Sequence, residues 1–256
     1  MSVDLSSIFD IDKHEFITLV GAGGKTSLLY RLSKEIESKG LSVIITTSTK
    51  IFFPKKEECE DVIIKKEEEL KDSLPSILKR KKRIVIGTKV LPNNKIDSLS
   101  TEFLNELYMK READVILCEG DGAKGRFLKA PNLTEPIIPK RTTLLIPVLG
   151  LNGIGNIFDD NVVFRPRFFE KITNIKLGEI ILEEKLLPLF SSPEGIMKGS
   201  PSDCRIIPFF NQADEKRNHG KGQKLAKMIL ESVPSIKKVI IGSARNKDFK
   251  PVVIEK

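Results

Sequence analysis

The stretch "ITLVGAGGKTS" at residues 17–27 places an apolar run directly before three glycines, a lysine and a threonine. A strand followed by a glycine-rich loop and a helix is the arrangement that cradles phosphate, because backbone N–H groups and the positive end of the helix point toward the anion. Glycine lets the backbone approach phosphate oxygens without an intervening Cβ. The stretch therefore predicts a phosphate-binding loop, with a glycine-rich turn carrying an incidental lysine as the alternative.

This loop has the form G-x-x-G-K-T. The longer pattern G-x-x-x-x-G-K-[ST] would need a glycine where Leu19 stands, so the loop is the shorter form, similar to that of the Mur ligases. We expect Lys25 to reach the β- and γ-phosphates of a nucleotide and the Thr26 hydroxyl to bind Mg²⁺. The residues predicted to contact the nucleotide here are Gly21, Ala22, Gly23, Gly24, Lys25, Thr26 and Ser27.

Short apolar runs alternate with longer segments of helical period along the chain. The predicted strands lie at 16–20, 42–46, 61–65, 83–87, 114–118, 143–149, 205–210 and 237–242, and the predicted helices at 26–39, 66–80, 98–111 and 218–232. Apolar strands separated by helices predict a mainly parallel sheet covered on both faces. We therefore expect an α/β fold, a P-loop NTPase-like three-layer sandwich. Residues 150–200 carry no obvious core strand and are predicted to be a helical insertion in a single nucleotide-binding domain, 1–256.

The composition is that of a globular chain, because 40% of the 256 residues are apolar and 30% are charged. No apolar run is long enough for a membrane-spanning helix, and the first residues lack the basic and apolar regions of a secretion signal. The three cysteines, Cys59, Cys118 and Cys204, form no C-x-x-C pair, so neither a cysteine zinc site nor a disulfide framework is expected. These features favour a cytoplasmic protein with no membrane partner.

The net charge of +8 raises the question of a nucleic-acid partner. Lysines stand beside glutamates, as in "KKEECEDVIIKKEEELK" at 55–71, and the chain has no Trp and two Tyr. No basic stripe interleaved with aromatic residues is present, so we expect no nucleic acid to bind. A phosphate-bearing small molecule would account for local basic residues equally well.

Two acids, Glu119 and Asp121, directly follow the apolar run at 114–118. Ligands of open α/β sheets bind at the carboxyl ends of the strands, so these carboxylates are predicted to meet the glycine-rich loop. Either acid could hold Mg²⁺ or orient a nucleophile, and with Lys25 they are the catalytic candidates. The basic residues Lys124, Arg126 and Lys129 follow and could bind an anionic substrate. The alternative is a solvated turn of mixed charge.

Four hydroxyl residues, 46–49, end the second predicted strand. Since this end of a parallel sheet lies beside the loop, we expect a hydroxyl there, that of Thr47, to bind Mg²⁺ or the γ-phosphate, and Lys50 to bind substrate. The alternative is that threonines simply favour strands.

A third strand end reads "NQAD" at 211–214, and "SAR" follows the next predicted strand at 243–245. Asn-x-x-Asp followed by Ser-Ala resembles the guanine-reading pair of GTPases. The Asp214 carboxylate could accept from two adjacent N–H donors of guanine, which adenine does not offer. Asn211 would tie its loop to the glycine-rich loop, and the Ala244 N–H, beside Ser243, would meet the guanine O6. Gln212 replaces the usual lysine of that pattern, and a simple helix cap by Asn211 and Asp214 is the alternative.

Nearly the whole chain, from about 16 to 245, resembles the YqeC-type proteins, a family of selenium-dependent hydroxylase accessory or selenium cofactor biosynthesis proteins. The matching stretches are "VGAGGKTSLLYRLS", "TTSTKIFFP", "EGDGAKGRFLKAPNLTEPIIP", "TTLLIPVLGLNGIG", "FRPRFFEKITNIKLGEIILEEKLLPLFSSPEGIMKGSPSDCRIIPFFNQAD" and "IIGSAR". The family usually has Glu-Ala-Asp at 119–121, a histidine at Phe164 and a lysine at Gln212. The resemblance implies a role in maturing molybdenum hydroxylases that carry a labile selenium.

Three functions are consistent with these features. The leading hypothesis is a Mg²⁺-dependent P-loop NTPase, using ATP or GTP, that serves as an accessory factor in selenium-dependent molybdenum hydroxylase maturation and contacts that hydroxylase or its cofactor. Arg165, Arg167 and Lys198 of the insertion would then meet the second substrate or the client enzyme. The second is a phosphoryl or nucleotidyl transferase, or a Mur-like ligase, acting on a small anionic acceptor. The third is a non-enzymatic binding protein, for instance a nucleic-acid binder that uses the +8 charge, which would need no intact Lys25.

Overall fold

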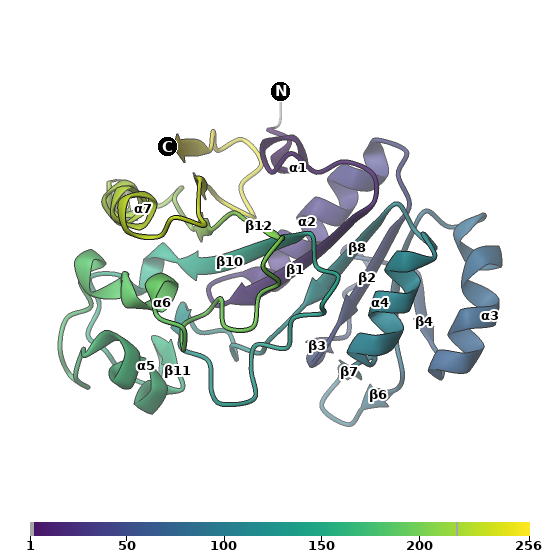
Figure 1. The fold of residues 1–256 in the computed structure, drawn as a ribbon, viewed down its shortest axis with the longest axis horizontal. Helices are drawn as coiled ribbons and strands as arrows, with labels where there is room; N and C mark the ends of the chain where they lie inside the picture. The colour runs from purple at the N-terminus through teal and green to yellow at the C-terminus, as the bar shows by residue number, and fades with distance from the viewer. Residues whose placement is uncertain (1–2, 219) are drawn as a thin grey trace.

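A mainly parallel β-sheet forms the centre of the computed structural model, which describes residues 3–218 and 220–256 (Figure 1). Its strands are β1 (Glu15–Gly21), β2 (Val43–Thr47), β4 (Val62–Ile64), β5 (Arg83–Gly87), β8 (Val115–Glu119), β10 (Leu144–Gly150), β12 (Arg205–Ile206), β13 (Phe209–Asn211), β14 (Lys238–Ile241) and β15 (Val252–Glu255). The order is β15-β14-β13-β10-β1-β8-β2-β5-β4, with β12 paired to β10. β15 is antiparallel to β14, whereas β1 is parallel to both β8 and β10.

Helices cover both faces of this sheet, as the sequence predicts. They are α1 (Leu5–Ile8), α2 (Lys25–Ser38), α3 (Glu67–Leu78), α4 (Thr101–Met109) and α7 (Lys221–Ser232). Side chains alternate along β1, so Ile17 and Leu19 pack in a buried cluster with α1 and α2, whereas Phe16 packs with α3 and α4 on the other face. A third cluster packs α7 beside that second face (Figure 1). The fold is therefore the three-layer P-loop NTPase-like α/β sandwich that was expected.

The segment 150–200 contains short helices rather than long ones. They are the 3₁₀-helices at Leu151–Gly153 and Glu183–Leu186, and the α-helices α5 (Pro166–Thr173) and α6 (Pro188–Ser191). A two-residue strand, β11 (Val163–Phe164), pairs with β9 (Leu128–Lys129) and joins the segment to the chain that follows β8. In Figure 1, α5, α6 and β11 lie together at one side of the sheet, beyond the arrowhead of β10.

A second small sheet was missed by the sequence patterns. It consists of β3 (Lys50–Phe52), β6 (Val90–Leu91) and β7 (Lys95–Asp97), in the order β3-β7-β6. β3 follows β2 and β6 follows β5, so this sheet extends from the carboxyl ends of two core strands. Strands of two or three residues are too short for a periodic pattern to identify.

Two other predictions at the sheet need correction. The strand expected at 205–210 is divided into β12 and β13, because Pro208 has no N–H with which to continue the ladder. The helix expected at 218–232 begins at Lys221, after a 3₁₀-helix at Lys216–Asn218. Among the described residues, no helix combines the length and apolar character needed to cross a membrane.

Candidate functional site

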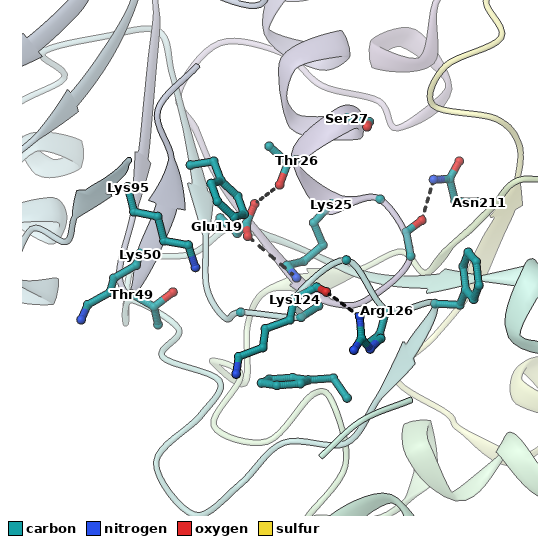
Figure 2. A pocket seen from close by; sticks show the side chains of 18 of the residues that line it. Lys25, Thr26, Ser27, Thr49, Lys50, Lys95, Glu119, Lys124, Arg126 and Asn211 are labelled. Atoms are coloured by element: carbon teal, nitrogen blue, oxygen red, sulfur yellow. Dashed lines mark hydrogen bonds and ion pairs between the residues drawn. The ribbon is translucent and has the colours of Figure 1, made fainter. Parts of the chain in front are cut away.

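The glycine-rich loop connects β1 to α2, as predicted (Figure 2). Gly23 and Gly24 have φ angles of +88° and +117°, which disfavour any other residue. A Cβ on Gly23 would lie 2.2 Å from the Gly150 backbone nitrogen, and one on Gly24 would lie 2.2 Å from Asn211 Nδ2. The glycines are therefore required by contacts of the loop with the ends of β10 and β13, in addition to any approach of a phosphate.

Lys25, the first residue of α2, points back into this loop. Its Nζ donates to the Gly21 carbonyl oxygen at 2.7 Å and lies 3.1 Å from Asp121 Oδ1 and 3.9 Å from Glu119 Oε1. Burial by itself would lower the pKa of Lys25, but the charges of Asp121 and Glu119 outweigh it and hold that pKa above its usual value. Lys25 is therefore a fixed ammonium group at the edge of the cavity that it lines.

Of the two predicted acids, Glu119 is the one that lines the cavity. It ends β8 and lies opposite Leu19 of β1, which brings its carboxylate beside the start of α2. Thr26 Oγ1 donates to Glu119 Oε2 at 2.8 Å. Burial raises the pKa of Glu119, although Lys25 and the Thr26 hydroxyl oppose that shift. A carboxylate and a hydroxyl in contact are oxygen donors that suit Mg²⁺, so these two residues fit the predicted metal site.

Asp121 lies beneath the loop and does not line the cavity. Its oxygens accept from the Gly21 backbone N–H at 3.0 and 3.1 Å, and Lys25 and Lys129 flank it at 3.1 and 2.8 Å. Burial opposes ionisation, but the two ammonium groups hold the pKa of Asp121 below its usual range. The predicted roles of Asp121 as metal ligand and catalytic acid are therefore corrected: its carboxylate holds the loop in place.

Lys129 is also buried, behind Asp121. Its Nζ donates to the Gly122 carbonyl at 2.7 Å and lies 3.2 Å from Glu135 Oε2, which in turn is 3.0 Å from Arg165 Nη1. The prediction that Lys129 contacts substrate is therefore corrected, because its ammonium group is enclosed by protein.

Of the hydroxyl residues 46–49, two are bonded within the protein and do not line the cavity, and the other two line it. Thr47 is buried and donates to the Glu119 carbonyl oxygen at 2.8 Å, so its predicted role as a metal ligand is corrected. Thr46 donates to the Ile86 carbonyl at 3.2 Å. Ser48, Thr49 and Lys50 do line the cavity.

Asn211 joins three segments at the other end of the loop. Its Nδ2 donates to the Gly23 carbonyl at 2.7 Å, as expected (Figure 2). Its Oδ1 accepts from the Ala244 N–H at 2.8 Å. The Ala244 N–H is thus already bonded, which corrects its predicted role toward guanine O6. Ser243 lines the cavity, and its hydroxyl accepts from the Asn246 N–H at 3.1 Å.

The neighbouring Asp214 is exposed and lines the cavity. Gln212 has a φ of 70°, and its Oε1 accepts from the Asn152 N–H at 3.3 Å. A 3₁₀-helix at Lys216–Asn218 follows Asp214, and α7 begins only at Lys221. Asn211 caps neither, because its amide bonds Gly23 and Ala244 instead.

One cavity of about 1190 Å³ connects these groups. Four of the predicted substrate residues line it: Lys50, Lys124, Arg126 and Arg165. Lys198, which was expected to meet the second substrate or the client enzyme, instead donates to the carbonyls of Asn132 and Leu133 at 2.9 and 3.0 Å. Sequence reasoning missed Phe52, Lys95 and Asn152, which also line the cavity. They lie in or beside elements of two or three residues and carry no motif that could have identified them.

A model of the YqeC protein family matches residues 17–167, which include the glycine-rich loop, Glu119 and Asp121. The chain belongs to the YqeC family. YqeC of Escherichia coli (strain K12) is 32% identical over 206 residues, which are 79% of this chain and 77% of that protein.

Several solved structures are also similar to this YqeC-family chain in fold. The signal recognition particle receptor FtsY from Elizabethkingia anophelis is 11% identical with a TM-score of 0.42, and chloroplast FtsY from Physcomitrella patens is 14% identical with a TM-score of 0.43. The matches cover 93% of this chain and 61% and 62% of those chains, so this chain spans about three fifths of their length. The 54 kDa signal recognition particle protein from Aeropyrum pernix, solved with GDP, is 14% identical over 93% of this chain and 43% of its own, with a TM-score of 0.42.

Proposed function

We propose that this YqeC-family chain is a Mg²⁺-dependent P-loop NTPase. One observation carries the proposal: the Thr26 hydroxyl at the start of α2 contacts the Glu119 carboxylate of the adjacent strand at 2.8 Å. This pair lies at the mouth of a loop whose backbone and lysine suit a triphosphate. Both residues line the same cavity as Lys25.

Different residues would bind the metal ion and the phosphates and support the loop. Thr26 and Glu119 would hold Mg²⁺, which when bound neutralises charge on the phosphates. The N–H groups of residues 24–27 would bind phosphate oxygens. The predicted contacts of Gly21, Ala22 and Gly23 through their N–H groups are corrected, because these already donate to a carboxylate and two carbonyls of the protein. Lys25 would contribute a positive charge that its buried partners keep protonated. Asn211 fixes the loop through Gly23. The contacts within the protein therefore hold the loop and Lys25 in place before a nucleotide binds.

Asp214 is our candidate for choosing guanine, although the Ala244 N–H is already bonded within the protein. Its exposed carboxylate lines the cavity beside Asn211. Replacing it, Asp214→Asn, is expected to weaken GTP binding by about tenfold or more and to favour XTP, because the amide matches the xanthine oxygen instead of the guanine N–H donors. Calorimetric titration of wild type and variant with GTP, ATP and XTP, each with Mg²⁺, measures this. Equal binding of ATP and GTP by wild type, with no change in the variant, would show that Asp214 reads no base.

We further propose that the NTPase acts in the cytoplasm as an accessory factor in the maturation of selenium-dependent molybdenum hydroxylases. Family membership supports this context. In cells that make such a hydroxylase, removal of the gene is expected to leave the purified enzyme with its molybdenum but without its labile selenium. Complementation with wild type should restore selenium, whereas complementation with Lys25→Met should not. Full selenium content after gene removal would refute the accessory role and leave the NTPase proposal standing.

The size of the cavity favours a second candidate function, transfer of a phosphoryl or nucleotidyl group to a small anionic acceptor. Ligand pockets commonly measure about 300–1,000 Å³, and this cavity is larger. Seven basic residues outside the glycine-rich loop also line it: Lys50, Lys55, Lys95, Lys124, Arg126, Arg165 and Arg245. Product analysis separates the two functions, since a transferase places phosphate or nucleotide on an acceptor whereas an NTPase releases free phosphate.

A further inference from the structure

We propose that the part of this cavity away from the glycine-rich loop is a second binding site, for a phosphorylated compound that carries a flat aromatic ring. The site would hold that compound next to the triphosphate, so its role as a second substrate rests on the proposed nucleotide site. Three observations support it: cations on two walls of the cavity that have no acidic partner among the described residues, an aromatic ring on each wall, and room for two ligands.

The first wall is the small sheet β3-β7-β6. Phe52 at the end of β3 is 56% exposed although it lines a cavity. Lys95 of β7 places its Nζ 4.6 Å from the centre of the Phe52 ring. Lys50, also on β3, lies on the same side of the cavity as Lys95 (Figure 2). This wall therefore offers an apolar ring together with two ammonium groups.

The second wall consists of residues 122–127 and the end of β11. Lys124 Nζ lies 5.6 Å from the centre of the Phe164 ring, and the guanidinium carbon of Arg165 lies 5.0 Å from it. Figure 2 shows Lys124 and Arg126 on this side, apart from Lys50 and Lys95, with Lys25 and Thr26 above Lys124.

Four basic residues on these two walls lack acidic partners in the described part of the chain, whereas the nearby acids have partners. Among residues 3–218 and 220–256, no acidic group lies within ion-pair distance of Lys50, Lys95, Lys124 or Arg126. The acids nearby are already engaged: Asp97 pairs with Lys89 at 3.4 Å and Glu135 pairs with Lys129 and Arg165. Glu58 accepts from the Lys55 backbone N–H at 2.9 Å. The result is an excess of positive charge in a concave space, which attracts an anion.

A phosphate alone would not use the two rings. Stacking of a flat apolar group on an exposed phenylalanine ring is favourable, because it removes apolar surface of both from water. Ammonium groups beside the ring can bind a phosphate on the same molecule. A phosphorylated heteroaromatic compound satisfies both requirements at once. The cavity volume of about 1190 Å³ leaves space for it beside a nucleotide.

Flavin mononucleotide is a suitable probe, because it carries a phosphate and a flat ring and is fluorescent. We expect fluorescence anisotropy to show that it binds wild type in saturating Mg²⁺–GTP. Lys124→Ala, an exposed position where folding is not at risk, should weaken binding by about tenfold, and Phe164→Leu by a similar factor. Lys140→Ala, an exposed lysine that does not line the cavity, is the matched control and should change nothing. Riboflavin, which lacks the phosphate, should bind more weakly.

The outcomes separate this proposal from the NTPase proposal. Competition between flavin mononucleotide and GTP, no binding of the probe at about 1 mM, or binding that ignores both Lys124→Ala and Phe164→Leu would overturn the second site and leave the NTPase intact. Binding of the probe that depends on Lys124 in a protein that takes neither GTP nor ATP would retain the site and refute the NTPase. Lys25→Met should lose GTP and keep the probe.

Discussion

Replacing Asp121 with asparagine is expected to lower the free energy of unfolding by about 3–5 kcal/mol, because the change leaves Lys25 and Lys129 buried without their shared counter-ion. The asparagine has nearly the volume of the aspartate, so a cavity contributes little to this loss. The Gly21 N–H would also lose one of the charge-assisted hydrogen bonds that hold it at 3.0 and 3.1 Å. Urea denaturation without nucleotide measures the difference.

Glu184→Gln is the matched control for that experiment. Glu184 also pairs with a lysine, Lys224 at 2.9 Å, but both side chains are exposed. Its neutralisation should change stability by no more than about 1 kcal/mol. A loss of that size or smaller for Asp121→Asn as well would contradict the view that this carboxylate organises the loop.

Lys25→Met is expected to weaken binding of the Mg²⁺–nucleotide by about 100-fold, since it removes the positive charge that lines the cavity beside Thr26 and Glu119. Methionine keeps the unbranched shape of the lysine stem, so the start of α2 should form normally. Titration calorimetry with GTP and with ATP measures the loss.

Lys129→Met is the control that this chain offers for Lys25→Met. Both substitutions remove a buried ammonium group bound to Asp121, but Lys129 does not line the main cavity. Both variants should lose stability, whereas Lys129→Met should keep nucleotide affinity within about threefold of wild type. Equal losses of affinity in the two variants would mean that Lys25 acts only by supporting the loop.

The parts of the fold and site that are local in sequence could be predicted. The strands β1, β2, β8 and β10 are continuous apolar runs, and the glycine-rich loop that follows β1 carries its own pattern. The contact of Asn211 with this loop could also be predicted, because Asn211 is the last residue of β13 and the loop follows the last residue of β1. The carboxyl ends of parallel strands lie at the same edge of a sheet.

Details that depend on where the chain turns could not be predicted. Glu119 and Asp121 are two residues apart, and only the path of the backbone after β8 sends one toward the cavity and the other beneath Gly21. The same limit applies to Thr47 and Thr49, of which only the second lines the cavity. Phe52 and Lys95 belong to strands of three residues, whose pairing is set by tertiary contacts rather than by periodicity.

The single amide of Asn211 has a consequence for how the protein is made. It joins the Gly23 carbonyl to the Ala244 N–H, which lies more than two hundred residues later in the chain. During synthesis on the ribosome the glycine-rich loop emerges early, but this bond cannot form until the segment after β14 has left the exit tunnel. A truncated product that ends before that segment would lack the bond that fixes the Asn211 amide, and with it part of the support of the glycine-rich loop.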